Sequence, residues 1–263
     1  MKRLRVLIVD NDRFVVEAVG DVLAEAGYLV RKAYDGLEGL RALRREPPDA
    51  LILDLIMPKV DGGRLCRYMR QDSRLRHIPV IVFSGLAARD LGEIGALDAQ
   101  AYVAKGPLPV VTENLLKALK ALTAPRQDAE RADVVFGYEG FRPRQVVTEL
   151  MAVKRHHEHL LRHLEEGVVE ADAAGAVTFL NPSAETFLGI AEAGAVGKAL
   201  GDLLPKADRK AVQEALEALG KDEGAKPCHL GLRGASRPLT AVLHRVPPEG
   251  TQPGGYLLIL RAT

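Results

Sequence analysis

A chain of 263 residues has room for two domains, and with 47% hydrophobic and 27% charged residues both can bury a core. The formal net charge of +1 argues against a protein that coats nucleic acid, and Cys66 and Cys228 lack the spacing of a zinc site or a disulfide framework. Since no apolar stretch is long enough for the core of a signal peptide or for a membrane span, we expect a cytoplasmic protein that does not enter a membrane.

Strands and helices are predicted to alternate in the first 122 residues. Short apolar runs, each too brief for a helix, predict strands at residues 6–9, 28–33, 50–53, 79–83 and 101–104. Apolar residues with helical spacing predict helices around residues 14–23, 37–43, 65–69, 86–97 and 115–122. Such alternation is typical of an α/β fold with a doubly wound, five-stranded parallel sheet.

Polar side chains stand at the ends of four of these strands: Asp10, Asp54, Ser84 and Lys105. The carboxyl ends of parallel strands meet at one edge of the sheet, where open α/β folds bind ligands. Clustered carboxylates attract Mg²⁺, and a carboxylate beside Mg²⁺ can attack a phosphoryl group to form an acyl phosphate, whose charge the ammonium and the hydroxyl would share. Taken by itself, Asp54 could instead be only the cap of the next helix.

Together with these strand ends, the block Asp54-Leu55-Ile56-Met57-Pro58 and the following Asp61-Gly62 resemble the receiver domain of bacterial two-component response regulators, over about residues 4–122. The resemblance implies that a histidine kinase phosphorylates Asp54. It also implies that the site includes Ser84, Lys105 and the switch aromatic Tyr102. A Mg²⁺ ion would be bound by Asp10, Asn11, Asp54 and the backbone carbonyl of Ile56.

Two positions depart from the family pattern. A second acid usually stands where this chain has Asn11, so Mg²⁺ binding should be weaker, although an amide oxygen can still bind the ion. Proline usually follows the lysine directly, whereas here Gly106 comes first, which removes the preference for a cis bond and should alter the switch. In the family, two further positions set the lifetime of the phosphate. Here they hold the bulky Ile56 and Leu86, which predicts slow autodephosphorylation.

Residues 123–165 form a predicted connector. Its first part is polar, apart from Val134-Val135-Phe136 and Phe141, which are too apolar for a solvated linker and are expected to dock on one of the domains. A helix is expected from about Arg144. Its apolar seam favours a dimerising coiled coil over an isolated surface helix, and consists of Val146, Leu150, Val153, His157, Leu160 and Leu164.

Four histidines lie on this predicted helix: His156, His157, His159 and His163. They lack the acid or cysteine partners of a metal site, so no metal is expected there. His157-Glu158 resembles the phosphorylated motif of histidine kinases only superficially, because the residues that should follow it and an ATP-binding domain are missing from the sequence.

The last segment, residues 166–263, predicts an α+β domain around an antiparallel sheet. Strands are expected at residues 167–172, 175–181, 228–232, 239–246 and 256–260, and helices at residues 182–188 and 209–219. Glu166-Gly167-Val168-Val169, residues 175–185 and Gly197-Lys198 resemble a PAS domain that covers about residues 164–262.

The sequence gives little indication of a PAS ligand. The Asn-Cys-Arg motif of flavin photoreceptors is absent, and residues 209–219 contain no histidine of the kind that binds haem. His229 and His244 fall on predicted strands, where partly exposed positions are the simpler interpretation. We therefore favour an unliganded PAS domain that dimerises or binds a partner over one that holds a small metabolite.

These patterns predict a receiver domain at residues 1–122, a connector with a signalling helix at 123–165 and a PAS domain at 166–263. We expect a response regulator of a two-component phosphorelay, not an enzyme, that signals to an unidentified protein or homodimerises through the connector helix and the PAS domain. No effector signature for DNA binding or cyclic-dinucleotide turnover is visible. One alternative is a phosphorylation-independent scaffold, marked by Asn11 and Gly106. The other is the front part of a hybrid sensor kinase.

Overall fold

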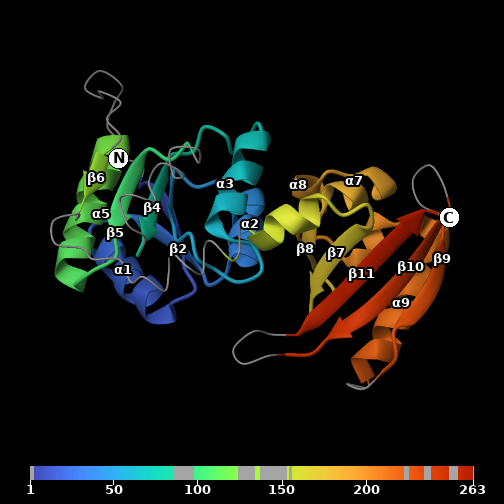
Figure 1. Cartoon of the computed structure of the whole chain (residues 1–263). Coiled ribbons are helices and arrows are strands. Elements are labelled where there is room, and N and C mark those ends of the chain that lie inside the picture. The colour runs from blue at the N-terminus through green and yellow to red at the C-terminus, as the bar shows by residue number, and fades with distance from the viewer. Residues whose placement is uncertain are drawn as a thin grey trace. The chain divides into compact units, whose positions relative to one another are not determined.

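The computed structural model describes residues 3–85, 98–123, 134–136, 153, 156–221, 225–233, 238–248 and 254–262. The chain divides into two compact units, Met1–Leu150 and Met151–Thr263, each with its own sheet (Figure 1). The predicted domain boundaries remain predictions, because most of residues 123–165 lie outside the described ranges. Within those ranges, no helix combines the length and the apolar character that a membrane span requires.

The first unit is built on a sheet of parallel strands. The strands are β1 (Arg5–Val9), β2 (Leu29–Ala33), β3 (Ala50–Leu53), β4 (Val80–Ser84), β5 (Ala101–Ala104) and β6 (Val134–Phe136). Their order across the sheet is β2-β1-β3-β4-β5-β6, and each neighbouring pair is parallel (Figure 1). Every residue of β3, β4 and β5 is buried, as expected for parallel strands covered on both faces. The predicted α/β fold is therefore confirmed, with its five expected strands in place.

The described helices of this unit are α1 (Arg13–Glu25), α2 (Gly36–Arg45), α3 (Gly62–Gln71) and α5 (Leu108–Thr123). Three of them begin after an aspartate whose carboxylate accepts hydrogen bonds from backbone N–H groups of the first turn: Asp12, Asp35 and Asp61. These caps fix where each helix leaves the carboxyl edge of the sheet. The helix predicted at residues 86–97 lies outside the described residues.

Helices α1 and α5 cover one face of the sheet. Val19 of α1 and Leu115 of α5 belong to one buried cluster with Ile8, Ile52 and other inward-facing strand residues. Successive side chains of a strand point to opposite faces, so Val9 points to the other face, where it lies against Gly39 of α2. A Cβ atom at Gly39 would come within 2.7 Å of Val9, which explains why glycine occupies this position of the helix.

Strand β6 shows how part of the connector docks. Residues 134–136 were expected to dock on one of the domains, and they do so as an additional parallel strand beside β5, which was not predicted. The register of this pair places Ala101, Tyr102 and Val103 opposite Val134, Val135 and Phe136, respectively. Three residues are too few to show the period of a strand, and the partner strand is distant in the sequence, so local pattern could not reveal the pairing.

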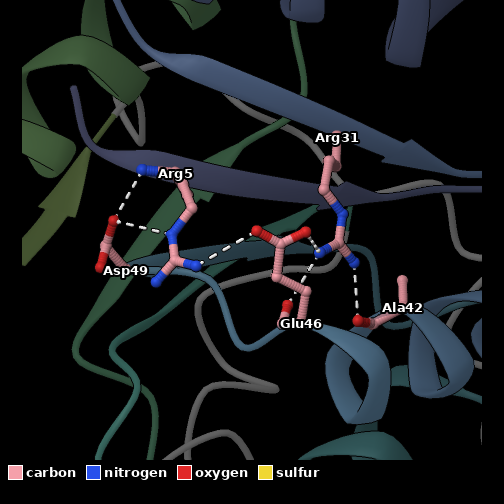
Figure 2. A network of polar contacts seen from close by, with 5 residues as sticks. All are labelled: Arg5, Arg31, Ala42, Glu46 and Asp49. Carbon is pink, nitrogen blue, oxygen red and sulfur yellow. Dashed lines mark hydrogen bonds and ion pairs between the residues drawn. The ribbon is translucent and has the colours of Figure 1, made fainter.

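At the amino ends of the strands, a network of polar contacts joins β1, β2 and the loop before β3 (Figure 2). Asp49 accepts hydrogen bonds from the backbone nitrogen of Arg5 at 2.8 Å and from its Nε at 3.5 Å. Glu46 pairs with Arg5 at 3.2 Å and with Arg31 at 3.1 Å, and Arg31 also donates to the carbonyl of Ala42 at 2.6 Å. These charges remain in contact with water, so the network orders this edge without strong electrostatic energy.

The second unit is an antiparallel sheet. Its strands are β7 (Gly167–Asp172), β8 (Val177–Leu180), β9 (Cys228–Leu232), β10 (Leu239–Val246) and β11 (Gly255–Ala262). The order is β8-β7-β11-β10-β9, with each neighbouring pair antiparallel (Figure 1). This confirms the predicted α+β arrangement, including the hairpin of β7 and β8.

Helices of four to sixteen residues connect β8 to β9. They are α7 (Pro182–Leu188), α8 (Glu192–Ala195), the 3-10 helix η3 (Leu200–Leu203) and α9 (Lys206–Lys221). Along the first half of β10, buried Leu239, Ala241 and Leu243 alternate with more exposed residues, so this strand packs one face on the core. α9 buries Val212 and Leu219 in the same unit.

Asn181 joins three parts of the second unit and is fully buried. Its Oδ1 accepts hydrogen bonds from the backbone nitrogens of Val168 at 2.8 Å and Ala184 at 2.9 Å, so it caps α7 as predicted. Its Nδ2 donates to the carbonyls of Leu161 at 3.0 Å and Glu166 at 2.8 Å. The bond to Leu161 ties the sheet to residues 156–162, which are helical as expected. The predicted start of that helix lies outside the described residues.

Candidate functional site

The site is built around the carboxylate that follows β3. Asp54 is 5% exposed, and its backbone nitrogen donates to the carbonyl of Val9 at 2.9 Å, which holds it beside the end of β1. Its own Oδ1 accepts a hydrogen bond from the backbone nitrogen of Leu55 at 2.7 Å. The side chain is therefore fixed at the carboxyl edge of the parallel sheet, as the sequence predicted.

Three charged side chains from three strand ends meet at this edge. The Nζ of Lys105 lies 2.7 Å from Oδ2 of Asp10 and 2.9 Å from Oδ2 of Asp54. Asp10 is fully buried, and its Oδ1 accepts a hydrogen bond from the backbone nitrogen of Asp12 at 2.9 Å. One ammonium is thus shared by two buried carboxylates, which leaves the cluster with a net negative charge.

Burial and mutual repulsion perturb this cluster. Burial raises the pKa of the Asp10 carboxyl, the charge on Asp54 raises it further, and Lys105 only partly opposes both effects. Burial by itself would lower the pKa of Lys105, but the two carboxylates outweigh it and the pKa of the ammonium is raised. Lys105 is therefore charged at neutral pH, and the pocket favours a further positive charge.

Ser84 and Tyr102 extend the cluster along β4 and β5. The carbonyl of Ser84 accepts hydrogen bonds from the hydroxyl of Tyr102 at 3.0 Å and from the backbone nitrogen of Lys105 at 3.0 Å. Tyr102 is 3% exposed, so its ring is turned into the protein. The hydroxyl of Ser84 is fully buried and has no hydrogen-bond partner among the described residues. A buried hydroxyl without a partner is costly, which suggests a partner that binds there.

The remaining predicted residues lie nearby in the chain. Asn11 is exposed, directly after Asp10, and Ile56 is half-buried in the loop that follows Asp54. Asp12 caps α1 by accepting hydrogen bonds from Phe14 and Val15, so its carboxylate is already engaged. Mg²⁺ typically binds one or two carboxylates and completes its shell with water and phosphate oxygens. The converging oxygens of Asp10 and Asp54 suit such an ion.

The loop after Asp54 is held by contacts that the sequence did not suggest. A Cβ atom at Gly62 would lie 2.2 Å from the carbonyl oxygen of Asp54, so this position has room only for glycine. Lys59 adopts a positive φ of 65°, and its Nζ pairs with Asp35 at 2.6 Å. The pair links this loop to the start of α2. The Asp-Gly of residues 61–62 hinted at the turn, but no sequence signal identified the partner of Lys59.

Two other expectations concern the switch. The bond between Lys105 and Gly106 is trans, like every peptide bond among the described residues. Leu86, one of the two residues expected to slow autodephosphorylation, lies outside the described ranges. That expectation therefore remains a prediction.

The histidines of the connector helix and of the second unit are not part of this site. His159 and His163 have ring centroids 4.3 Å apart, and Nδ1 of His163 lies 2.8 Å from the carbonyl of His159. His229 is exposed on β9 and His244 is half-buried on β10, so both lie on strands as predicted. Across the described ranges, no group of three or more His, Cys, Asp or Glu side chains is arranged to hold a metal ion.

Comparisons with known proteins agree with this architecture. Residues 6–120 match the family model of the response regulator receiver domain, and residues 155–231 match that of the PAS fold. Response regulator MprA of Mycobacterium avium (strain 104) is 39% identical over 140 residues, which cover 51% of this chain and 58% of MprA. This chain therefore spans little more than half the length of the curated relatives that it matches.

Two solved structures are similar to slightly less than half of this chain. The chemotaxis response regulator CheY4 of Vibrio cholerae is 28% identical, with a TM-score of 0.43, and the match covers 46% of this chain and 99% of CheY4. The N-terminal domain of a response regulator receiver protein from Methanoculleus marisnigri JR1 is also 28% identical, with a TM-score of 0.38, and covers 48% of this chain and 100% of that domain. The protein described here carries a response regulator receiver domain followed by a PAS domain.

Proposed function

We propose that this chain is a phosphorylation switch of a two-component system, with Asp54 as the residue that accepts the phosphoryl group from a histidine kinase. The observation that carries the proposal is the convergence of Asp10, Asp54 and Lys105 at the carboxyl edge of a receiver sheet. The Nζ atom of Lys105 lies 2.7 Å from Oδ2 of Asp10 and 2.9 Å from Oδ2 of Asp54. A purely structural ion pair would need one carboxylate for one ammonium. A second buried carboxylate adds cost unless a further cation or reaction uses it.

The proposed reaction is a transfer of a phosphoryl group between two side chains. A carboxylate oxygen of Asp54 forms a bond to phosphorus while the bond between phosphorus and the imidazole nitrogen of the kinase breaks, and the imidazole takes up a proton. The product is an acyl phosphate. Lys105 is already bonded to Oδ2 of Asp54 and can neutralise charge that develops on the phosphoryl oxygens. The hydroxyl of Ser84, without a partner among the described residues, can donate to one of these oxygens.

Receiver domains generally bind Mg²⁺ at the phosphorylation site. In this chain, Asp10, Asn11, Asp54 and the carbonyl of Ile56 are the proposed ligands. The ion would neutralise negative charge on the incoming phosphoryl group. Asp10 and Asp54 supply the buried carboxylates, and the amide of Asn11 contributes no charge, so we propose weaker binding than in a site with a third acid.

The proposed output is a change in protein contacts, with no catalytic step. The described part of the connector helix carries exposed apolar side chains: Val153 is 55% exposed and Leu160 is 51% exposed. Leu164, which the predicted seam also included, is 39% exposed but follows the helix, whose described residues end at Arg162. His157, at another position of the seam, is exposed as well. Apolar residues at this spacing pack well against an identical helix. We therefore propose a homodimer through this helix and the PAS domain, with an unidentified protein as the downstream partner.

Phosphorylation is tested with acetyl phosphate, Mg²⁺ and intact mass. We expect the whole chain to gain one phosphoryl group, and Asp54→Asn to gain none. The matched control is Asp49→Asn, because Asp49 flanks β3 at its other end and pairs with Arg5 on the protein surface. This variant should be phosphorylated like the unchanged protein. A chain that gains no phosphoryl group would instead be a scaffold with a degenerate receiver.

The dimer is tested on the same samples by sedimentation velocity. Leu160→Glu places a charge in the apolar seam and should yield a monomer, whereas Arg162→Glu, also exposed but outside the seam, should not. Equal masses for the two variants would argue against the connector helix as the dimer contact.

A further inference from the structure

Strand β6 attaches the connector to the strand that carries the switch aromatic. It lies beside β5 at the end of the sheet order (Figure 1). Val135 lies directly opposite Tyr102. Residues 124–133, before it, and residues 137–150, after it, belong to the segment between the receiver helices and the second unit. Residues 134–136 of the connector are thus hydrogen-bonded through their backbone to β5.

A chain of hydrogen bonds links this strand pair to the phosphorylation site. The hydroxyl of Tyr102 donates to the carbonyl of Ser84, and the backbone nitrogen of Lys105 donates to the same carbonyl, both at 3.0 Å. Lys105 in turn contacts Asp54 at 2.9 Å. Ser84 therefore stands between the proposed phosphoacceptor and the residue that faces β6.

The unpartnered hydroxyl of Ser84 indicates how phosphorylation would act on this series of hydrogen bonds. Its Oγ is buried without a hydrogen-bond partner among the described residues, and an anionic phosphoryl oxygen on Asp54 would supply a strong acceptor. A bond at Oγ restricts the position of Ser84, and hence of the carbonyl that holds Tyr102. Phosphorylation should then stabilise the inward position of Tyr102, which is the position in which β5 is paired with β6.

We propose that pairing between β5 and β6 depends on phosphorylation: a phosphoryl group on Asp54 strengthens the pairing and so fixes the start of the connector. This inference rests on the proposed function and adds the route by which the signal leaves the receiver. With β6 paired, residues 134–136 are held at the edge of the receiver sheet, and a weaker pairing would release them.

The coupling is reciprocal. If phosphorylation strengthens the strand pair, then a formed pair must favour the phosphorylated state by the same factor. Disruption of β6 should therefore lower the yield of phosphorylation at limiting acetyl phosphate, although β6 contains none of the proposed site residues.

Amide hydrogen exchange of the whole chain tests the pairing directly. The peptides to follow contain residues 101–104 and 134–136, with the extent of phosphorylation measured by intact mass in the same sample. We expect several-fold slower exchange in both peptides after phosphorylation. Unchanged or faster exchange in a fully phosphorylated sample would overturn the inference and leave the proposed function intact. Failure to phosphorylate would count against the proposed function itself.

A second arm does not depend on phosphorylation. Tyr102→Phe removes the hydroxyl that bonds Ser84, and exchange in residues 134–136 should become faster in the unphosphorylated chain. Tyr34→Phe is the matched control, because that hydroxyl bonds Glu17 away from β5. If the two variants exchange equally at β6, the link from Tyr102 to β6 does not exist.

Proline substitutions give an internal control on the strand itself. Successive N–H groups of a strand point to opposite sides, so only one of Val134 and Val135 can donate to β5. One of the variants Val134→Pro and Val135→Pro should speed exchange in residues 101–104 and abolish its response to phosphorylation, and the other should change it much less. Two variants that both leave the exchange of β5 unaltered would contradict the pairing.

Discussion

The two ends of strand β3 carry the same residue type in opposite circumstances. Asp49 precedes the strand and Asp54 follows it. Asp49 accepts hydrogen bonds from Arg5, and its side chain is 26% exposed (Figure 2). Asp54 is 5% exposed and shares the ammonium of Lys105 with a second buried acid, Asp10. A single short strand thus separates a carboxylate used for structure from one that we propose for chemistry.

The difference between the two edges lies in how completely their charges are balanced. At the amino edge, two arginines and two acids alternate in a surface network, so their charges balance, and water screens the remaining electrostatic interactions. At the carboxyl edge, two buried acids share one lysine that is partly exposed, and a serine hydroxyl has no partner among the described residues. Incomplete balance in a buried cluster is costly, which supports our proposal that the carboxyl edge binds a cation and a phosphoryl group.

Removal of the shared cation should produce the largest difference between the edges. Lys105→Met leaves two buried carboxylates without their partner, and we expect a loss of about 2–3 kcal/mol, reduced for the partial exposure of the lysine. Arg5→Met, the matched change at the amino edge, should cost much less because that pair is in contact with water. Urea unfolding, monitored by amide exchange in β1 and β3, measures the loss of stability in each variant.

Magnesium provides the check on that result. Because the ion can replace the missing positive charge between the carboxylates, added Mg²⁺ should restore part of the stability of Lys105→Met. Arg5→Met retains the proposed ion site, so Mg²⁺ should stabilise it only as much as it stabilises the unchanged protein. Equal losses for both variants, or equal responses to the ion, would remove the proposed distinction between the edges.

An added carboxylate should sharpen the comparison by a smaller amount. Asn11→Asp introduces a third acid directly after Asp10, and we expect Mg²⁺ to bind several-fold more tightly in calorimetric titration. Gln71→Glu adds the same charge at the exposed last residue of α3 and should leave the affinity unchanged. If Asn11→Asp has no effect either, then residue 11 does not contribute to the ion site.

The smallest effect is a difference in pH dependence. Burial raises the pKa of Asp10 above its ordinary value of 3.8, so between that value and the raised one the folded state binds the additional proton and stability falls as pH rises. Hydrogen bonds from Arg5 and the charge of Arg31 lower the pKa of Glu46 below its ordinary 4.5. The stability that ionised Glu46 contributes to the folded state is therefore fully present above pH 4.5, and it is lost as pH falls through the lowered pKa.

The two acids should thus respond in opposite directions in a metal-free titration of stability. Relative to the unchanged protein, Asp10→Asn should gain stability as pH rises through the window of Asp10. Glu46→Gln should instead lose stability as pH rises through the window of Glu46. The exposed Glu46 should show only a slight slope, and slopes of the same sign would contradict the assignment.

Much of the carboxyl edge could be predicted from the sequence. Asp10, Asp54 and Lys105 follow apolar runs directly, and parallel strands bring their carboxyl ends together whatever the details of packing. The amino edge offered no such rule. The contacts of Arg5 and Arg31 with Glu46 depend on the register of three strands and on where α2 ends, and local patterns do not specify these.

Strand β6 and Asn181 show the same limit. Asn181 was recognised as a cap because the cap and its helix are adjacent in the sequence. Its bonds to Leu161 and Glu166 need the folded unit, as does the pairing of Val135 with Tyr102. Contacts between distant segments therefore account for most of what the sequence left open.

The four bonds of Asn181 also bear on how the second unit can be prepared in isolation. A fragment cut just before the first strand of that unit would lack the carbonyls of Leu161 and Glu166 and would leave the buried Nδ2 group of Asn181 without either acceptor. Such a vacancy typically costs about 1–3 kcal/mol. Biochemists who excise this unit should therefore retain the preceding helical turn, since it completes the interior of the piece they wish to study.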